Sequence, residues 1–421
     1  MKFALAHDAE ASAAAVNAER HITPVPRISI QAFCETPELA GAVQSAVHDR
    51  RMVKAHVKVQ MGGLFATLEA YSSAATPNVI LIEHNGNGTE LIEGLDRLAE
   101  ACDAGTKVVI VGRLNDIILY RELVRRGISD YLISPLAPID VVRAISGLFC
   151  APDSEPVGRV IAVIGAKGGI GASTVAHNVA FAIARDLALD TVIADLDLPF
   201  GTAGLDFNQD PPQGIADAVF SPDRVDSAFV DRLLSKCTDQ LSLLASPATL
   251  EREYDFGPET FDPILDAMRN TIPYIVLDLP HLWTSWAKRA LVGADEVLIV
   301  TAPDLANLRN AKNLFDFVRG ARPNDRRPYY LLNQVGMAKR PEVRTADFAK
   351  ALDAEPLAMI PFDPQLFGTA ANNGQMIAEV SAGHKITETF LAIAKVLTGR
   401  TEVKKQKRAL LSPLLAKLRG R

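Results

Sequence analysis

The stretch Gly165-Ala-Lys-Gly-Gly-Ile-Gly-Ala-Ser-Thr174 decides the fold of this chain. An apolar run over residues 160–164 precedes it, and residues 175–184 follow it with the composition of a helix. A glycine-rich turn between a strand and a helix lets backbone N–H groups approach phosphate oxygens, and the helix N-terminus adds a favourable dipole. The stretch therefore predicts a phosphate-binding loop in an α/β domain. The plainer alternative is a glycine-rich turn in a Rossmann-like sheet.

One position of this loop departs from the usual pattern. Phosphate loops usually end in Gly-Lys-[Ser/Thr], and that lysine reaches the β- and γ-phosphates. This chain has Ala172 at the lysine position and an earlier lysine, Lys167, before two glycines. Ser173 keeps a hydroxyl for magnesium. Because the lysine most directly tied to γ-phosphate chemistry is missing, we expect ATP binding with weak hydrolysis.

Carboxylates follow two later apolar runs. Asp195 and Asp197 stand at the end of one predicted strand, and Asp278 stands at the end of another. A divalent ion that bridges phosphates takes hard oxygen ligands. One carboxylate at a strand end is weak evidence. The loop and both strand ends in this order, at the same ends of parallel strands, favour a nucleotide site with magnesium.

These motifs resemble the deviant Walker A loop and switch regions of the MinD/ParA family, in which two chains sandwich ATP. The resemblance implies that Lys167 reaches the partner chain's phosphates and that Asp197 orients the attacking water. It also implies that Ser173, Asp195 and Asp278 serve magnesium. The loop residues implied to bind nucleotide are Gly165, Ala166, Lys167, Gly168, Gly169, Ile170, Gly171, Ala172, Ser173 and Thr174.

The same family frames the adenine with an asparagine after a later strand and with an Ile-Pro-x-Asp loop. Asn333 follows a predicted strand over residues 330–332, and Pro361 and Asp363 lie in Ile-Pro-Phe-Asp. The resemblance implies that Asn333 reads the base and that Pro361 and Asp363 pack beside it. An asparagine that caps a strand is also a common loop residue, and that alternative stays open.

Residues 28–149 alternate strand and helix, which indicates βαβ units and a parallel sheet. We expect strands over residues 28–33, 57–60, 79–83, 108–112 and 131–134, and helices over 37–51, 91–102 and 139–149. This layout resembles a response-regulator receiver domain but lacks its chemistry. The phosphoacceptor aspartate is Glu83, the acidic cluster is reduced to Glu35, and the lysine before the final proline is Ser134. We interpret this domain as a pseudo-receiver that serves as an interaction surface. Glu83 either imitates a phosphorylated aspartate or faces a helix as a plain carboxylate.

Length and composition fit two α/β domains in the cytoplasm. The 421 residues are 48% hydrophobic with a net charge of −6, which gives no general attraction to nucleic acid. We expect a disordered tail over residues 1–26, a receiver-like domain over 27–149, a linker over 150–158 and a MinD/ParA-like domain over 159–400. The four cysteines lie far apart, so we expect reduced thiols and no disulfide or zinc. No apolar run is long enough to span a membrane.

Residues 401–421 form a basic tail. From Lys404 onward it carries seven lysines and arginines, and its leucines at 410, 411, 414, 415 and 418 fall on one helical face. A basic amphipathic helix is typical of contact with a membrane surface or a partner. A helix folded onto its own domain is the alternative, with about equal weight.

A degenerate receiver joined to a MinD/ParA-like domain is similar to the CpaE/TadZ family of tight-adherence (Flp) pilus assembly. The resemblance implies an ATP-dependent homodimer at a cell pole, with peripheral contact to the inner membrane as an option, that recruits pilus proteins such as the secretion ATPase. An active ParA-type ATPase that positions cargo or DNA is the main alternative. The missing aspartate and lysine disfavour a phosphorylated regulator. An iron–sulfur reductase is excluded because Cys237 alone lies in the second domain.

Overall fold

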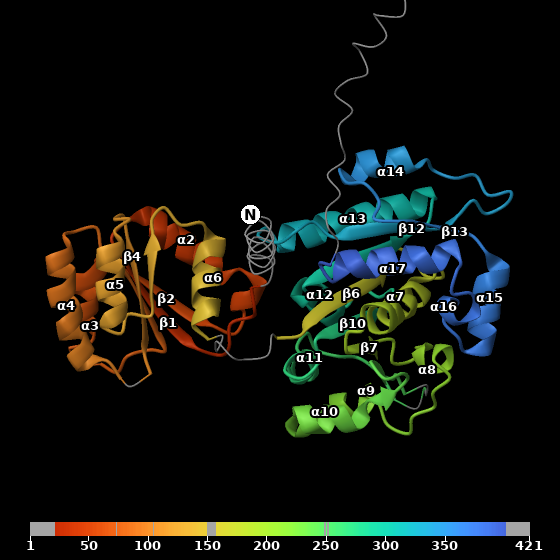
Figure 1. Cartoon of the computed structure of the whole chain (residues 1–421), viewed down its shortest axis with the longest axis horizontal. Coiled ribbons are helices and arrows are strands. Elements are labelled where there is room, and N and C mark those ends of the chain that lie inside the picture. The colour runs from red at the N-terminus through yellow and green to blue at the C-terminus, as the bar shows by residue number, and fades with distance from the viewer. Residues whose placement is uncertain are drawn as a thin grey trace, which may run out of the picture.

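The computed structural model describes residues 22–400 apart from 73, 104, 150–156, 248, 249 and 251. It contains two α/β domains side by side, each built on its own mainly parallel sheet (Figure 1). The predicted fold class is therefore confirmed. The expected basic tail and nearly all of the expected linker and N-terminal tail lie outside the described residues.

The first domain has a five-stranded parallel sheet in the order β2-β1-β3-β4-β5. Its strands are β1 (Ser29–Cys34), β2 (His56–Met61), β3 (Val79–Glu83), β4 (Lys107–Gly112) and β5 (Asp130–Ile133). Its helices are α2 (Pro37–Val47), α3 (Gly63–Ala70), α4 (Gly88–Ala101), α5 (Ile117–Arg125) and α6 (Pro138–Leu148), with a 3-10 turn η1 (Arg50–Met52) after α2. The expected strands and helices are all present, with small shifts at their ends.

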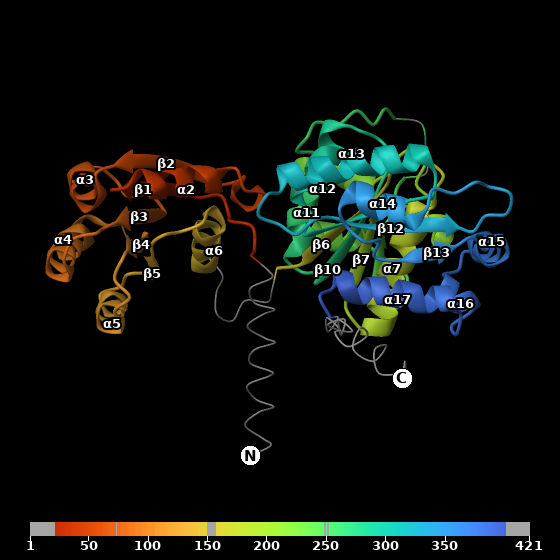
Figure 2. The ribbon, with the colours of Figure 1, turned by 90° about the horizontal axis from the view of Figure 1, so that it is seen from above.

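Helices cover both faces of this sheet because its central strands are apolar on both sides. The five residues of β3 are all buried. On one face α2 and α6 pack through Leu39, Val43 and Ile145, and on the other α3, α4 and α5 pack through residues such as Leu95 and Leu123. Figure 2 shows this layering from above.

The second domain has an eight-stranded sheet in the order β13-β12-β11-β6-β10-β7-β9-β8. Its strands are β6 (Arg159–Gly165), β7 (Thr191–Asp195), β8 (Ser235–Lys236), β9 (Leu241–Leu244), β10 (Tyr274–Leu279), β11 (Glu296–Thr301), β12 (Tyr329–Val335) and β13 (Met359–Pro361). All neighbours pair in parallel except β8 with β9. This antiparallel edge hairpin was not expected from the sequence.

Helices lie on both faces of the second sheet, with α12 and α13 on one side and α17 on the other (Figure 2). The helices are α7 (Ala172–Leu187), α8 (Ala203–Asp206), α9 (Ile215–Val219), α10 (Ser227–Leu233), α11 (Asp262–Arg269), α12 (Ser285–Gly293), α13 (Leu305–Ala321), α14 (Thr345–Leu352), α15 (Pro364–Asn373), α16 (Ile377–Val380) and α17 (Lys385–Leu397), with a 3-10 turn η2 (Pro222–Arg224). The central strand β6 is buried from its second residue onward and leads directly into the glycine-rich loop. Within the described residues, no helix is both long and apolar enough to cross a membrane.

Two expectations about the chain near the first domain need correction. Residues 22–26 belong to the domain and not to a disordered tail, because Val25 is buried and its N–H donates to the Arg51 carbonyl at 2.8 Å. The helix expected over residues 37–51 ends at Val47, and Asp49 caps the separate turn η1 by accepting the Arg51 N–H at 3.0 Å.

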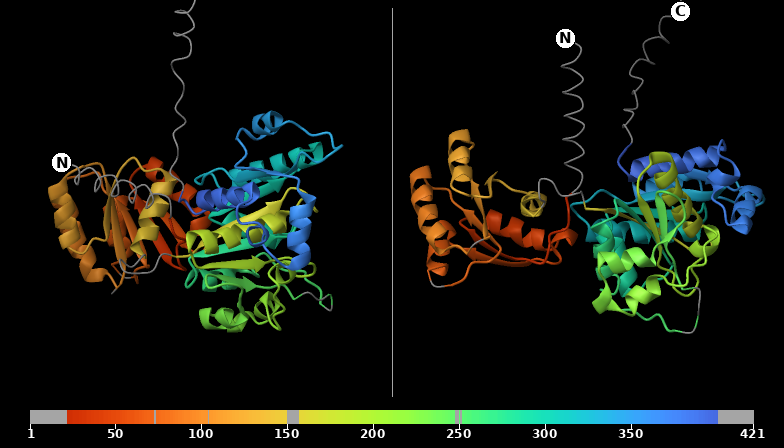
Figure 3. Two further views of the ribbon diagram at one scale, coloured as in Figure 1. Left: turned by 45° about the vertical axis from the view of Figure 1, so that its right-hand side comes forward. Right: turned by 60° about the horizontal axis from the view of Figure 1, so that its bottom comes forward.

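The turn η1 joins the two domains, which stay side by side in both views of Figure 3. The guanidinium of Arg50 donates to Asp325 at 2.7 Å and to Asp295 at 3.2 Å. Arg51 pairs with Asp325 as well as with Asp49, and Asn324 donates to Asp49 at 3.0 Å. The side chains of these ion pairs are almost fully buried. The junction is therefore a desolvated polar contact rather than a loose tether.

Candidate nucleotide site

The glycine-rich loop lies between β6 and α7, as the sequence predicts. Gly169 and Gly171 have φ angles of 76° and 81°, a region that favours glycine. A Cβ on Gly171 would lie 2.8 Å from the side-chain nitrogen of Asn333, so no larger residue fits there. The loop then enters α7 at Ala172, where the first N–H groups of the helix have no carbonyl partner within the helix. The backbone thus forms the kind of cradle that binds phosphate.

Side chains from three other segments hold the carbonyl oxygens of this loop. Each bond points a loop carbonyl toward the protein, which leaves the loop N–H groups for an anion. The four bonds are His281 Nδ1 to the Gly165 oxygen (2.9 Å), Asn310 Nδ2 to Ala166 (2.9 Å), Gln334 Nε2 to Gly169 (3.3 Å) and Asn333 Nδ2 to Ile170 (2.7 Å). Sequence reasoning found Asn333 alone. The other three have no motif, although His281 follows the end of β10 and Gln334 lies near the end of β12.

Lys167 is exposed at the tip of the loop. Its charge helps to lower the pKa of Asp304, which burial would raise and which hydrogen bonds from Asn307 also lower. Ala172 and Ser173 are half-buried at the start of α7. The loop therefore presents one lysine to the outside and none at the usual helix position.

Asp195 lies at the carboxyl end of β7 and is fully buried. One oxygen accepts the Asp197 N–H at 3.1 Å, and the other accepts the Ala203 N–H at 3.1 Å and the Ser246 hydroxyl at 3.2 Å. Burial and the neighbouring Asp278 raise the pKa of Asp195 to about 6. In this arrangement Asp195 organises the segment that carries Asp197, since both of its oxygens are engaged by the protein.

Asp278 at the end of β10 is buried beside His177, a residue of α7 that sequence reasoning missed. The two imidazole nitrogens of His177 face Asp206 at 2.7 Å and Asp278 at 3.4 Å. Burial would lower the pKa of His177, but the hydrogen bond to Asp206 and the negative charge of Asp278 outweigh it and raise the pKa to about 10. Asp278 Oδ1 has no hydrogen-bond partner in the described chain. This free oxygen suits a divalent cation.

Asp197 stands two residues beyond the end of β7 and is half-buried. Its carboxylate accepts the Phe200 N–H at 3.3 Å, and burial raises its pKa. The side chain belongs to the same edge of the sheet as the glycine-rich loop, because parallel strands end together. The structure therefore brings Asp197, Asp195 and Asp278 to one end of neighbouring strands, as predicted.

A small cavity of about 170 Å³ adjoins the glycine-rich loop. Gly169, Gly171 and Thr174 form one wall of the cavity, and the opposite wall includes Asn333 and Phe362. Pro361 and Asp363 also line it, so the residues implied to frame adenine are gathered in one place. Its assignment to adenine remains a prediction.

The phosphoacceptor position of the first domain is filled by a buried structural carboxylate. Glu83 accepts the N–H groups of Glu35 and Thr36 at 2.8 Å each and the Thr36 hydroxyl at 2.7 Å. The two N–H groups share Oε2, and Asn85 donates to Oε1, the oxygen that also accepts the Thr36 hydroxyl, at 3.2 Å. Thr36 is the N-cap of α2, so Glu83 stabilises the start of that helix. Glu83 therefore faces a helix as a structural carboxylate, which agrees with the plain-carboxylate alternative, and imitation of phosphorylation stays a prediction.

The described cysteines are free thiols, as expected: Cys34 is buried, and Cys102 and Cys237 are half-buried. Burial raises the pKa of Cys34 and of Cys237 to about 12.

Known proteins are similar to parts of this chain. A family model for an AAA domain matches residues 158–327. The septum site-determining protein MinD of Synechocystis sp. is 29% identical over 154 residues, which are 36% of this chain and 56% of that protein's own length. A solved ParA family ATPase from Chlorobium tepidum is 26% identical, with a TM-score of 0.51, over 56% of this chain and 98% of that one.

A solved pilus assembly protein, CpaE from Caulobacter crescentus, is 46% identical over 31% of this chain and 100% of that chain. Its TM-score is 0.30.

Proposed function

Because this chain belongs to the CpaE type of the MinD/ParA family, we propose that it is an ATP-binding hub for the assembly of tight-adherence pili. Two chains sandwich ATP, and the dimer recruits other pilus components, including the secretion ATPase. The proposed place of action is the cytoplasm at a cell pole. The observation that carries the proposal is the glycine-rich loop, whose carbonyls are tied back by His281, Asn310, Asn333 and Gln334.

Magnesium fits the site because Asp278 has a buried oxygen without a partner close to the phosphate cradle. Ser173 and Asp278 would hold the ion, and Asp195 would orient the segment around it. The ion would neutralise charge on the phosphate oxygens. Asp197 would position water, and Lys167 would cross to the partner's nucleotide from its exposed place on the loop.

Hydrolysis is proposed to be slow because Ala172 replaces the lysine that reaches the β- and γ-phosphates. A charge-assisted hydrogen bond contributes roughly 1.5–3 kcal/mol. Its loss weakens nucleotide binding by about one to two decades. The expected result is micromolar or weaker affinity and turnover well below that of a robust P-loop ATPase. Rapid turnover would favour an active ParA-type ATPase that moves cargo.

We propose that the receiver-like domain recruits the other pilus components. Glu83 stands at the phosphoacceptor position and bonds the start of α2, so this domain is not expected to be phosphorylated. An apolar surface on α5 supports this role. We call it the α5 patch, and it consists of Leu114, Ile117, Ile118, Tyr120, Val124 and Ile133, which are all exposed. Contiguous exposed apolar side chains are typical of protein–protein contacts.

Isothermal titration calorimetry with Mg-ATP and Mg-ADP, combined with sedimentation, tests the nucleotide switch. We expect ATP to bind and to produce a dimer, and Lys167→Ala to abolish the ATP-dependent dimer while leaving the fold intact. Lys350→Ala is the matched control because Lys350 is exposed on α14, outside the loop. Absence of binding at millimolar ATP, or equal dimer populations for parent and Lys167→Ala with and without ATP, would overturn the proposal.

Peripheral membrane contact is proposed for the basic tail over residues 401–421. Each nearby lysine or arginine contributes about 1 kcal/mol on an anionic surface. We expect co-sedimentation with anionic liposomes that weakens with salt and is lost in the double variant Leu414→Asp with Leu418→Asp. If the parent does not co-sediment with such liposomes, either as a monomer or as the ATP-bound dimer, the tail is instead a helix that binds a partner protein or packs on its own domain.

A further inference from the structure

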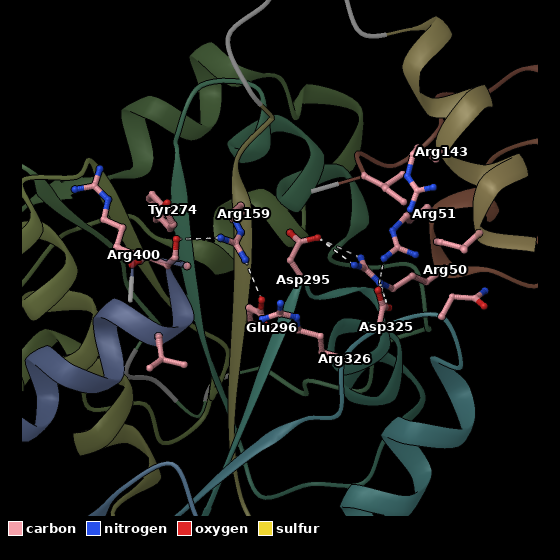
Figure 4. Close-up of a pocket in the computed structure, with 16 residues that line it drawn as sticks. Arg50, Arg51, Arg143, Arg159, Tyr274, Asp295, Glu296, Asp325, Arg326 and Arg400 are labelled. Carbon is pink, nitrogen blue, oxygen red and sulfur yellow. Dashed lines mark hydrogen bonds and ion pairs between the residues drawn. The ribbon is translucent and has the colours of Figure 1, made fainter. Parts of the chain in front are cut away.

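A cavity of about 770 Å³ lies at the junction of the two domains, and arginines surround it (Figure 4). Three of them come from the first domain and three from the second: Arg50, Arg51 and Arg143, then Arg159, Arg326 and Arg400. The volume is in the range of small-molecule sites. Any occupant of this cavity would contact both domains at once.

The carboxylates that line the same cavity are already engaged by arginines. Asp325 pairs with Arg50, Arg51 and Arg322, and Asp295 pairs with Arg50 and Arg269. The remaining carboxylate, Glu296, accepts a bond from Arg159 at 2.9 Å. Each carboxylate that lines the cavity therefore already has an arginine partner other than Arg326 and Arg400.

Two arginines at the cavity form no ion pair with a carboxylate within the part of the chain that the structure describes. Arg326 is exposed at the rim, and its charge stabilises the ionised form of nearby Glu296. Arg400 is also exposed and donates only to the Leu187 carbonyl, at 3.2 Å. Arg143 pairs with Asp140 in an ion pair that is largely open to water. The rim is thus a concentration of positive charge with little internal compensation.

Two guanidinium groups among the cavity residues have a buried N–H without an acceptor. The Nε atoms of Arg51 and Arg159 have no hydrogen-bond partner among the described residues. Arg51 is only 7% exposed, so water has little access to it. Both Nε atoms are closed to solvent, so they do not face the open cavity. An occupant of the cavity therefore reaches the rim arginines Arg143, Arg326 and Arg400.

We propose that this cavity binds a small anion carrying at least two phosphate groups. The planar guanidinium matches phosphate oxygens with two parallel hydrogen bonds. Two phosphates are needed because the arginines face one another from two domains. The ligand bridges the receiver-like domain to the MinD/ParA-like domain and so fixes their relative orientation.

This site is separate from the nucleotide site. Arg159 begins β6, whereas the glycine-rich loop follows its last residue, Gly165. A strand rises about 3.3 Å per residue, so roughly 20 Å separates the two ends. Binding in the cavity therefore needs no part of the phosphate loop.

Calorimetric titration of the full chain with sodium pyrophosphate, without magnesium, tests the proposal. We expect one site per chain. The double variant Arg326→Gln with Arg400→Gln should weaken binding at least tenfold, because each lost charged contact is worth about a tenfold change. Both residues are exposed and neither holds the domains together, so the variant should fold.

Two controls separate this site from general electrostatics and from the phosphate loop. Arg327→Gln with Arg344→Gln removes equal charge from exposed positions outside the cavity. Gly171→Val distorts the phosphate loop, because Gly171 has a φ of 81° and a Cβ there would lie 2.8 Å from Asn333 Nδ2. Both controls should bind pyrophosphate in the cavity as the parent does. Equal weakening in the charge control, loss of binding in Gly171→Val, or no binding at millimolar pyrophosphate would overturn the proposal.

A competition arm identifies the source of the phosphates. Adenosine diphosphate is added to Gly171→Val protein that is saturated with pyrophosphate. If adenosine diphosphate displaces pyrophosphate, and if its affinity falls in the double variant Arg326→Gln with Arg400→Gln, the cavity binds a pyrophosphate group carried by a nucleotide. Retention of pyrophosphate shows that it takes the free inorganic anion.

Discussion

At the scale of single residues, His177 is the clearest case of a side chain whose role depends on its surroundings. It lies on an apolar helix but is held between Asp206 and Asp278. The folded-state pKa of about 10 is above the ordinary value of 6.5. The stability that the charged imidazole contributes is therefore complete below pH 6.5 and is lost as the pH rises from 6.5 to about 10.

We predict that His177→Gln lowers the free energy of unfolding by about 3–5 kcal/mol near neutral pH, because the buried Asp278 and the half-buried Asp206 lose their cation. Urea unfolding at pH 6, 8 and 10 measures the effect, and the difference from the parent should shrink toward pH 10. His56→Gln, at an exposed histidine, is the control. A difference that stays constant from pH 6 to 10 would contradict the charged state of His177.

Glu83 gives a second prediction at this scale. Glu83→Ala removes the acceptor of the Glu35 and Thr36 N–H groups and leaves two partly buried donors unpaired. This change should lower the free energy of unfolding by about 1–3 kcal/mol. Thermal unfolding of the parent and the variant is the measurement, with Glu38→Ala on the exposed side of α2 as control. Equal melting temperatures for Glu83→Ala and the parent would show that these bonds add nothing to stability.

At the scale of helices and strands, sequence reasoning worked where one element carries its own signal. β3 and β6 were predictable because they are continuous apolar runs, and the loop after β6 because its glycines are needed for positive φ angles. The end of α2 was misplaced because Asp49 caps a new turn there. The pair Arg50–Asp325 could not be predicted, since its members are 275 positions apart and each looks like an ordinary surface charge.

The candidate site shows the same division. Lys167, Asp197 and Asp278 were identified because they stand at fixed places beside strand ends. His281 and Asn310 were missed because their role is to bond loop carbonyls, and only the packed structure shows which carbonyls they reach. Residues that contact a ligand leave a motif, whereas residues that hold the motif in shape do not.

The α5 patch provides the prediction at this scale. Ile117→Glu with Ile118→Glu places charges on an apolar surface without touching the core, since Ile118 is 76% exposed. We expect the variant to bind Mg-ATP like the parent and to lose at least tenfold in affinity for the secretion ATPase, measured by surface plasmon resonance. Phe65→Glu, at a residue that is 79% exposed on α3, is the matched control. Unchanged affinity in the double variant would remove the α5 patch from recruitment.

At the scale of the whole molecule, the domains are joined through charges that are almost completely desolvated. The side chains of Arg50 and Asp295 are each 6% exposed. Breaking a buried ion pair by removing one partner typically costs about 3–5 kcal/mol, because the other charge stays buried. Arg50 contacts Asp295 and Asp325 together, so its loss leaves two carboxylates short of a partner.

We therefore predict that Arg50→Ala separates the unfolding of the two domains. Differential scanning calorimetry of the parent should show one cooperative transition, and the variant should show an earlier transition for the receiver-like domain followed by that of the MinD/ParA-like domain. Mg-ATP should raise the melting temperature of the second transition alone, because ligands stabilise the domain that binds them. Arg143→Ala, whose ion pair with Asp140 lies within the first domain and is largely exposed, should behave like the parent. If Arg50→Ala also melts in one step, the junction is held by contacts other than these charges, and the domains would then move as one body whatever occupies the cavity between them.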